Sequence, residues 1–190
     1  LIQAGTELIK RHGYRRITVE EICEKADTSK MTFYKYFNNK QEITLYILDR
    51  IFDAMFQEFH RIFAEHKPFA QRIEEFVEYK LTSFIDEDFT FLEELLDEAD
   101  EEIKELMAAA QARAANLQLE TIAAAKEQGE VNPWVTPELY VLTLNHISNM
   151  VRDPLMVSQF KGDYNAMSRF LVKFLMHGLI KPSVESLHDR

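Results

Sequence analysis

A short segment near the N-terminus carries the side-chain types that proteins use to bind nucleic acids. Phe33 and Phe37 recur within it at helical spacing, and we expect both rings to face inward. The faces that they leave free present cationic heads, hydroxyls and a thioether, which reach phosphate oxygens and base edges. The residues concerned are Lys30, Met31, Thr32, Tyr34, Lys35 and Tyr36. This pattern makes the segment a candidate for reading DNA.

Two hydroxyl residues stand where a phosphate could bind. Thr18 and Ser29 are each expected at the N-terminus of a short helix. Free backbone N–H groups and the helix dipole favour an anion at such a position. Both residues therefore join the candidate DNA-binding set.

Three short helices are expected to position these side chains. The first spans Leu1–His12, and the second begins with a capping-box pattern at Thr18 and runs to about Ala26. The third spans Lys30–Tyr36. A tight turn at Asp27, a residue type that tolerates a left-handed backbone, joins the last two into a helix-turn-helix.

Longer helices are expected to fill the rest of the chain. They are predicted at Lys40–His66, Phe69–Ile85, Phe91–Asp100, Ile103–Gln128, Glu138–Arg152 and Tyr164–Ile180. No strand pattern of useful length interrupts them. The sequence thus predicts an all-α fold of about nine helices, with a DNA-binding domain over residues 1–46 and a helical domain over residues 47–190.

Charge is divided unevenly between these two predicted domains. The net charge is −10, yet residues 1–46 carry eight Lys and Arg against six Asp and Glu. The acidity therefore belongs to the second domain, where it opposes nonspecific binding to DNA. The single cysteine, Cys23, cannot form an internal disulfide, which suits the cytoplasm. No apolar run approaches the ~18–20 residues that cross a bilayer, and we expect a short segment to precede Leu1.

The residues from Gly13 to Glu42 form a more specific pattern. It comprises Gly13-Tyr14, Ile17–Ala26 and Ser29–Glu42, and its most distinctive run is Tyr34-x-Tyr36-Phe37-x-x-Lys40. This pattern resembles the DNA-binding head of the TetR (tetracycline repressor)/AcrR-type family and covers about a quarter of the chain. Family members commonly have Gly and Val where this chain has Asp27 and Thr28.

The resemblance implies a role for each position. Lys30, Met31 and Thr32 would approach bases, while Tyr34, Tyr36 and Lys40 would grip the DNA backbone and Thr18 would add a phosphate contact. In the competing interpretation, the two tyrosines only complete the packing of the head and Lys40 is a solvated helix residue. The resemblance favours the first interpretation.

The resemblance also implies what the second domain does. It would bind a small effector and form a homodimer through helices 138–152 and 164–180, placing two recognition helices ~34–36 Å apart on a near-palindromic operator in double-stranded DNA. The chain would then be a repressor that a small, largely apolar or aromatic effector releases from its operator. The residues expected to line the effector pocket are Phe59, Phe63, Tyr79, Met107 and His146.

Other functions find less support in the sequence. A helical di-iron enzyme needs two Glu-x-x-His pairs, and the only such spacing is Glu185 to His188. The acidic stretch Asp86–Glu105 matches no calcium loop, and a solvated helix face explains it better than a cation site. We therefore expect no enzyme activity, cofactor or metal. The remaining alternative is a helical protein–protein adaptor without specific DNA binding.

Overall fold

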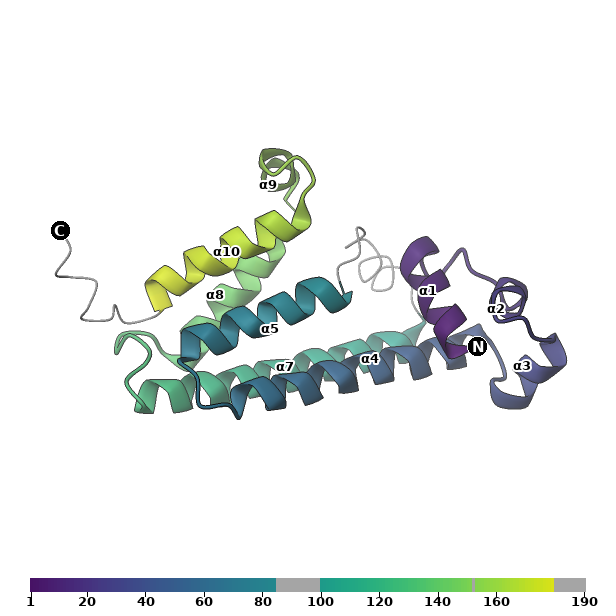
Figure 1. Cartoon of the computed structure of the whole chain (residues 1–190), viewed down its shortest axis with the longest axis horizontal. Helices are drawn as coiled ribbons and strands as arrows, with labels where there is room; N and C mark the ends of the chain where they lie inside the picture. The colour runs from purple at the N-terminus through teal and green to yellow at the C-terminus, as the bar shows by residue number, and fades with distance from the viewer. Residues whose placement is uncertain (85–99, 152, 180–190) are drawn as a thin grey trace. The chain divides into compact units, whose positions relative to one another are not determined.

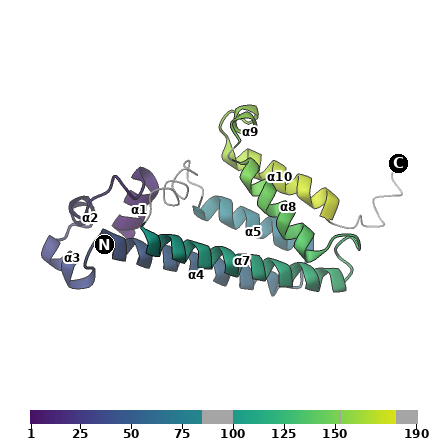
Figure 2. The ribbon, with the colours of Figure 1, turned by 180° about the vertical axis from the view of Figure 1, so that it is seen from behind.

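The computed structural model describes residues 1–84, 100–151 and 153–179. Figure 1 labels the helices in these ranges, and Figure 2 shows them from behind. They are α1 (Ile2–His12), α2 (Val19–Lys25), α3 (Lys30–Tyr36), α4 (Lys40–Phe63), α5 (Phe69–Phe84), α7 (Glu101–Glu127), α8 (Pro137–Met150), α9 (Pro154–Gln159) and α10 (Tyr164–Leu179). The predicted all-α fold is confirmed. Of the helix predicted at Phe91–Asp100, residues 91–99 lie outside the described ranges.

The described chain divides into two compact units. The first contains residues 1–57 and 100–112, and the second contains residues 58–84, 113–151 and 153–179. Both α4 and α7 contribute residues to each unit. No helix in the described ranges is long and apolar enough to cross a membrane.

The first unit is built around the helix-turn-helix. Its buried cluster contains residues of α1, α2, α3 and the start of α4, and its members are Ile9, Ile17, Ile22, Cys23, Phe33, Ile43 and Ile47. A Cβ added at Gly5 would lie 2.9 Å from the Cδ1 of Ile47, so the small residue lets α1 pack closely on α4.

Side-chain caps fix where α2 and α3 begin. The hydroxyl of Thr18 accepts from the backbone N–H of Glu21 at 3.2 Å, and the Glu21 carboxylate accepts from the backbone N–H of Thr18 at 2.7 Å. This is the predicted capping box. The hydroxyl of Ser29 likewise accepts from the backbone N–H of Thr32 at 3.1 Å. Each cap satisfies a backbone donor that a helix leaves unpaired at its N-terminus.

Asp27 forms the turn between α2 and α3. Its φ is +47°, so this non-glycine residue occupies the left-handed region, as its place in the predicted turn requires. The N–H of the following residue, Thr28, donates to the carbonyl of Cys23 at 2.9 Å and closes the end of α2. The turn therefore forms without the glycine that commonly occupies it.

The second unit packs α5, α8 and α10 around the later turns of α7. In Figures 1 and 2, α10 lies against α5, α8 and α9. The buried members of its core are Phe69, Ile73, Ile122, Ala125, Val131, Val135, Tyr140 and Met176. Glu130 ties the loop after α7 to the start of α5, because its carboxylate accepts from the Phe69 N–H at 2.9 Å and from Arg72 at 2.8 Å.

Several helices differ from the sequence prediction; α7, for example, begins at Glu101 rather than at Ile103. The first long helix ends at Phe63 rather than at His66. The short helix α9 begins after Asp153, in the stretch that the predicted helices Glu138–Arg152 and Tyr164–Ile180 leave between them. The carboxylate of Asp153 accepts from the N–H groups of Leu155 and Met156, and a proline at the first helical position needs no hydrogen-bond partner.

Candidate nucleic-acid interface

The orientation of α3 is set by Phe33. Its side chain is fully buried, whereas Met31 is 84% exposed. Tyr34 packs against the edge of the Phe33 ring but remains exposed itself, as do Lys30, Lys35 and Tyr36. Thr32 is half-buried and shares a hydrogen bond with the Ser29 hydroxyl. We call Lys30, Met31, Thr32, Tyr34, Lys35 and Tyr36 the α3 surface; the structure brings all six together on one short helix.

Lys25, Lys30 and Lys35 each have an intramolecular partner. Lys30 forms an ion pair with Glu20, which raises the pKa of the lysine and lowers that of the glutamate. Lys25 pairs with Glu7 of α1 at 2.8 Å. The ammonium of Lys35 lies 5.9 Å from the ring centre of Tyr36. Any DNA group that contacts Lys30 therefore has to compete with a carboxylate.

Lys40 occupies a different environment from the one expected. Its ammonium donates to the backbone carbonyls of Tyr14 at 2.9 Å, of Ile17 at 3.1 Å and of Arg15 at 3.4 Å. It also lies 4.5 Å from the ring centre of Tyr14. Burial lowers the pKa of Lys40, while the charges of Asp100 and Glu21 oppose that shift. Lys40 thus holds the loop before α2, and its phosphate contact stays a prediction.

Thr18 and Ser29 lie at the surface, but their hydroxyls are already engaged as helix caps. The loop before Thr18 exposes two further cations, Arg15 and Arg16, which the sequence reasoning did not select. A signal for them was present, because Gly13 ends one helix and Thr18 begins the next. Residues between such stops lie in a loop, where a charged side chain is normally exposed.

Tyr14 anchors the same loop from the other side. Its side chain is buried against Leu48, Ile103 and Met107, and its hydroxyl donates to the Asp100 carboxylate at 2.6 Å. Burial and this hydrogen bond to a carboxylate raise the pKa of Tyr14. The loop and the first turns of α7 are thereby joined within the first unit.

The N-terminal segment can be compared with known proteins. Residues 1–47 match the family model described as bacterial regulatory proteins, tetR family. Residues 1–47 of the chain are therefore similar to the DNA-binding segment of the tetR family. The resemblance identified from the sequence is confirmed, and the segment contains the caps, the turn and the α3 surface described above.

A curated relative matches the same N-terminal part of the chain. The uncharacterized HTH-type transcriptional regulator YvkB of Bacillus subtilis (strain 168) is 36% identical over 50 residues, which are 26% of this chain and 26% of that protein. The match therefore spans about a quarter of the relative's length.

Solved structures share the fold over nearly the whole chain. A transcriptional regulator from Saccharomonospora viridis in complex with choline is similar with a TM-score of 0.79 at 18% identity, over 95% of this chain and 96% of that one. SmeT, the repressor of the Stenotrophomonas maltophilia multidrug efflux pump SmeDEF, has a TM-score of 0.74 at 18% identity, over 96% and 90%. SmeT is also known in a complex with triclosan. At such identities these similarities establish the fold.

The expected effector-binding residues do not all meet. Phe59 and Phe63 stack with ring centres 4.3 Å apart, and Phe76 packs on Phe59 at 5.1 Å and on Tyr79 at 6.4 Å. We call these four residues the aromatic cluster; it belongs to the second unit. Met107, by contrast, is buried in the first unit beside Tyr14. His146 is exposed on α8.

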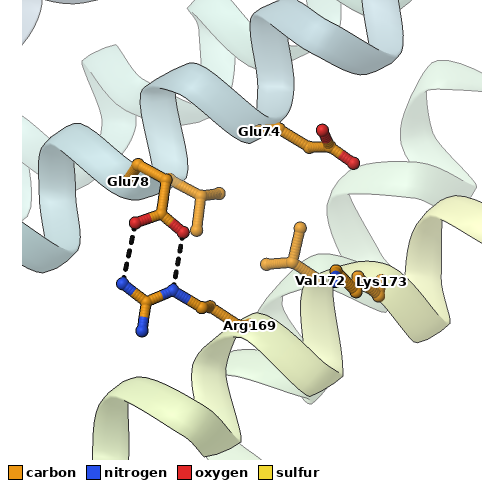
Figure 3. A pocket seen from close by; sticks show the side chains of 6 residues that line it. Glu74, Glu78, Arg169, Val172 and Lys173 are labelled. Carbon is orange, nitrogen blue, oxygen red and sulfur yellow. Dashed lines mark hydrogen bonds and ion pairs between the residues drawn. The ribbon is translucent and has the colours of Figure 1, made fainter.

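A surface groove lies elsewhere in the second unit, between α5 and α10 (Figure 3). Its lining residues are Glu74, Val77, Glu78, Arg169, Val172 and Lys173. Arg169 donates two hydrogen bonds to Glu78, at 2.7 and 2.8 Å, and lowers the pKa of that carboxylate. None of the five expected pocket residues lines this groove.

The acidic stretch Asp86–Glu105 is described only in part. Residues 86–99 of it lie outside the described ranges. Within those ranges, no group of three or more His, Cys, Asp or Glu side chains could hold a metal ion.

The raised pKa of Tyr14 has a consequence for stability at alkaline pH. In the unfolded chain this phenol ionises near its ordinary value of 10, whereas in the folded chain it keeps its proton to a higher pH. Its stabilising contribution is therefore complete below pH 10 and is lost as the pH rises toward the folded-state pKa. We therefore expect that, above pH 10, the free energy of unfolding falls less steeply with rising pH in Tyr14→Phe than in the wild type.

Denaturant unfolding at a series of alkaline pH values measures this slope. Tyr140→Phe should reduce the alkaline slope in the same way, since burial raises the pKa of Tyr140 to about 12. A Tyr14→Phe protein with the same alkaline slope as the wild type would show that the phenol is not held in its protonated form.

Proposed function

We propose that this protein is a transcriptional regulator that binds an operator in double-stranded DNA through the α3 surface. The observation that carries the proposal is the outward presentation of Lys30, Met31 and Tyr34 by a helix whose Phe33 is buried. This arrangement lies within the segment that matches the tetR family. A recognition helix of this kind places its exposed side chains at base edges in the major groove.

The proposed contacts divide into two kinds. Lys30, Met31 and Thr32, in the first turn of α3, contact base edges. The residues around them contact phosphates; they are Thr18, Ser29, Tyr34, Lys35, Tyr36 and Lys40. The ion pair between Lys30 and Glu20 opens when DNA replaces the carboxylate, so part of the binding free energy is spent on exchanging partners.

We further propose a homodimer formed through α8 and α10. These helices leave large apolar side chains exposed, namely Leu139, Leu142, Met150, Phe170 and Phe174. The rings of Phe160, Phe170 and Phe174 pack in a row, with centres 5.5 and 6.3 Å apart. Monomeric proteins rarely expose a contiguous apolar patch of this kind. A two-fold dimer would offer two α3 surfaces to a near-palindromic site.

The effector proposal rests on the aromatic cluster. This cluster would bind a small apolar or aromatic compound. The compound would prefer a conformation in which the two recognition helices of the dimer are wrongly spaced for the operator, so its binding would release the DNA. The complexes of two structural neighbours with choline and with triclosan support small organic ligands for this fold. Met107 and His146, also expected at this site, are left out because Met107 is buried beside Tyr14 and His146 is exposed.

A panel of hydrophobic and aromatic compounds tests the effector proposal. We expect at least one compound to raise the melting temperature, because a ligand that binds only the folded state stabilises it. Phe63→Ala should remove that shift for the same compound, whereas Trp134→Ala, an exposed change in a loop, should leave it in place. A panel without any such shift would count against the aromatic cluster as a ligand site.

Salt-dependent DNA binding tests the proposed α3 contacts. The wild type should bind the DNA upstream of its own gene, with log Kd rising with log salt by about 0.9 per phosphate neutralised. We expect Lys30→Ala and Tyr34→Ala each to weaken binding by about 1–3 kcal/mol, and a phosphate-binding lysine to lower the salt slope by about one when removed.

Lys104→Ala supplies a charge-matched control, because Lys104 is exposed on α7 in the same unit. If Lys30→Ala and Tyr34→Ala bind as tightly as this control, the α3 surface does not contact DNA. If the wild type itself shows no salt-dependent binding, the protein–protein adaptor becomes the better account.

The oligomeric state tests the proposed dimer. Phe174 is 68% exposed, so Phe174→Glu should leave the folded protomer intact while placing two charges in the interface. We expect this variant to sediment as a monomer and the wild type as a dimer. Trp134→Glu alters an equally exposed aromatic outside α8 and α10 and should remain dimeric. A dimeric Phe174→Glu protein would place the interface elsewhere.

A further inference from the structure

The loop between α1 and α2, residues 13–18, is held from two sides within the first unit. It begins at Gly13, whose φ of +76° turns the chain out of α1, and it ends at the N-cap Thr18. Three of its backbone carbonyls accept hydrogen bonds from the ammonium of Lys40. These bonds fix the path of the loop backbone on the first turn of α4.

The second hold on the loop is the side chain of Tyr14. Its ring is 7% exposed and packs on Leu48 of α4 and on Ile103 and Met107 of α7. Its hydroxyl donates to the Asp100 carboxylate across a separation of 86 residues in the sequence. The negative charge of Asp100 also favours the charged form of Lys40 against the effect of burial. Asp100 therefore acts on both groups that hold the loop.

Asp100 is an unexpected member of a DNA-binding unit. A carboxylate repels phosphate, and the carboxylate of Asp100 is exposed to solvent. Its position is explained by the bond that it accepts from Tyr14. Without that bond, the ring of Tyr14 would still fill its apolar site. Its hydroxyl, however, would no longer fix the rotation of the ring or the position of the loop backbone.

We propose that Tyr14 and Asp100 are positioning residues for DNA binding. Their hydrogen bond fixes the position of the loop. The loop in turn fixes the position of the α2 N-terminus, with Thr18 and the exposed Arg16. The inference rests on the proposed function, because it assumes that this surface contacts DNA. It extends the DNA-binding unit to the first turns of α7, beyond the segment that matches the family model.

A mutant cycle on the full-length protein tests the inference. The DNA probe is a duplex that the wild type enriches from a randomised library, with affinity measured by fluorescence anisotropy. We expect Tyr14→Phe and Asp100→Ala each to weaken binding roughly three- to tenfold, the range that one partly buried hydrogen bond can contribute. The double variant should bind no more weakly than either single variant, because both remove the same bond.

A conservative variant and two controls separate positioning from general stability. Asp100→Asn should recover most of the affinity lost in Asp100→Ala, since the amide oxygen still accepts from the phenol, although it removes the negative charge that favours the charged form of Lys40. Glu102→Ala removes an exposed hydrogen bond that Gln41 donates from α4 to α7, and it should change affinity little. Ile122→Val lowers stability from the core of the second unit and should leave affinity unchanged.

The outcomes are distinguishable. The inference is overturned if Tyr14→Phe and Asp100→Ala bind as the wild type does, if their effects add in the double variant, or if Ile122→Val weakens binding equally. A wild type that enriches no duplex overturns the proposed function, and this inference with it. Weak binding by Tyr14→Phe and Asp100→Ala, with rescue by Asp100→Asn, supports both.

Discussion

The burial of Phe33 is the interaction on which the rest of the first unit depends. A helix of seven residues, the length of α3, is not stable by itself in water. Phe33 supplies the missing free energy by packing without any exposed surface among residues of α1, α2 and α4. Because its ring faces inward, Met31 and Tyr34 on the other faces of the helix must face solvent. The exposed α3 surface thus follows from apolar packing.

Ion pairs within the first unit bear on how the α3 surface would bind DNA. Lys30 is held by Glu20 and Lys25 by Glu7, so these two cations are paired with carboxylates when DNA is absent. An acidic protein with a net charge of −10 can still bind a phosphate backbone if only these local pairs exchange partners. The proposed binding is consequently sensitive to salt and selective about which face meets the DNA.

Features that depend on neighbours in the sequence were predictable. Thr18, Ser29 and the Asp27 turn lie where local caps and backbone preferences place them, and the helix that begins at Pro137 follows the same rules. The helix α9 was missed because Asp153-Pro154 suits both a break and a helix start. The roles of Lys40 and Tyr14 depend on partners 23–26 and 86 residues away, a distance that no local pattern encodes. For His146, the sequence did not indicate which face of α8 is exposed.

Directed cleavage of DNA from α3 tests the central claim most directly. Met31→Cys places a thiol at an exposed position of the α3 surface, and the natural Cys23 is buried, so a DNA-cleaving reagent attaches at residue 31. The account predicts cleavage of the enriched duplex at two positions about one helical turn apart, each in the major groove. Cleavage no greater than that from the same reagent at Trp134→Cys would contradict it.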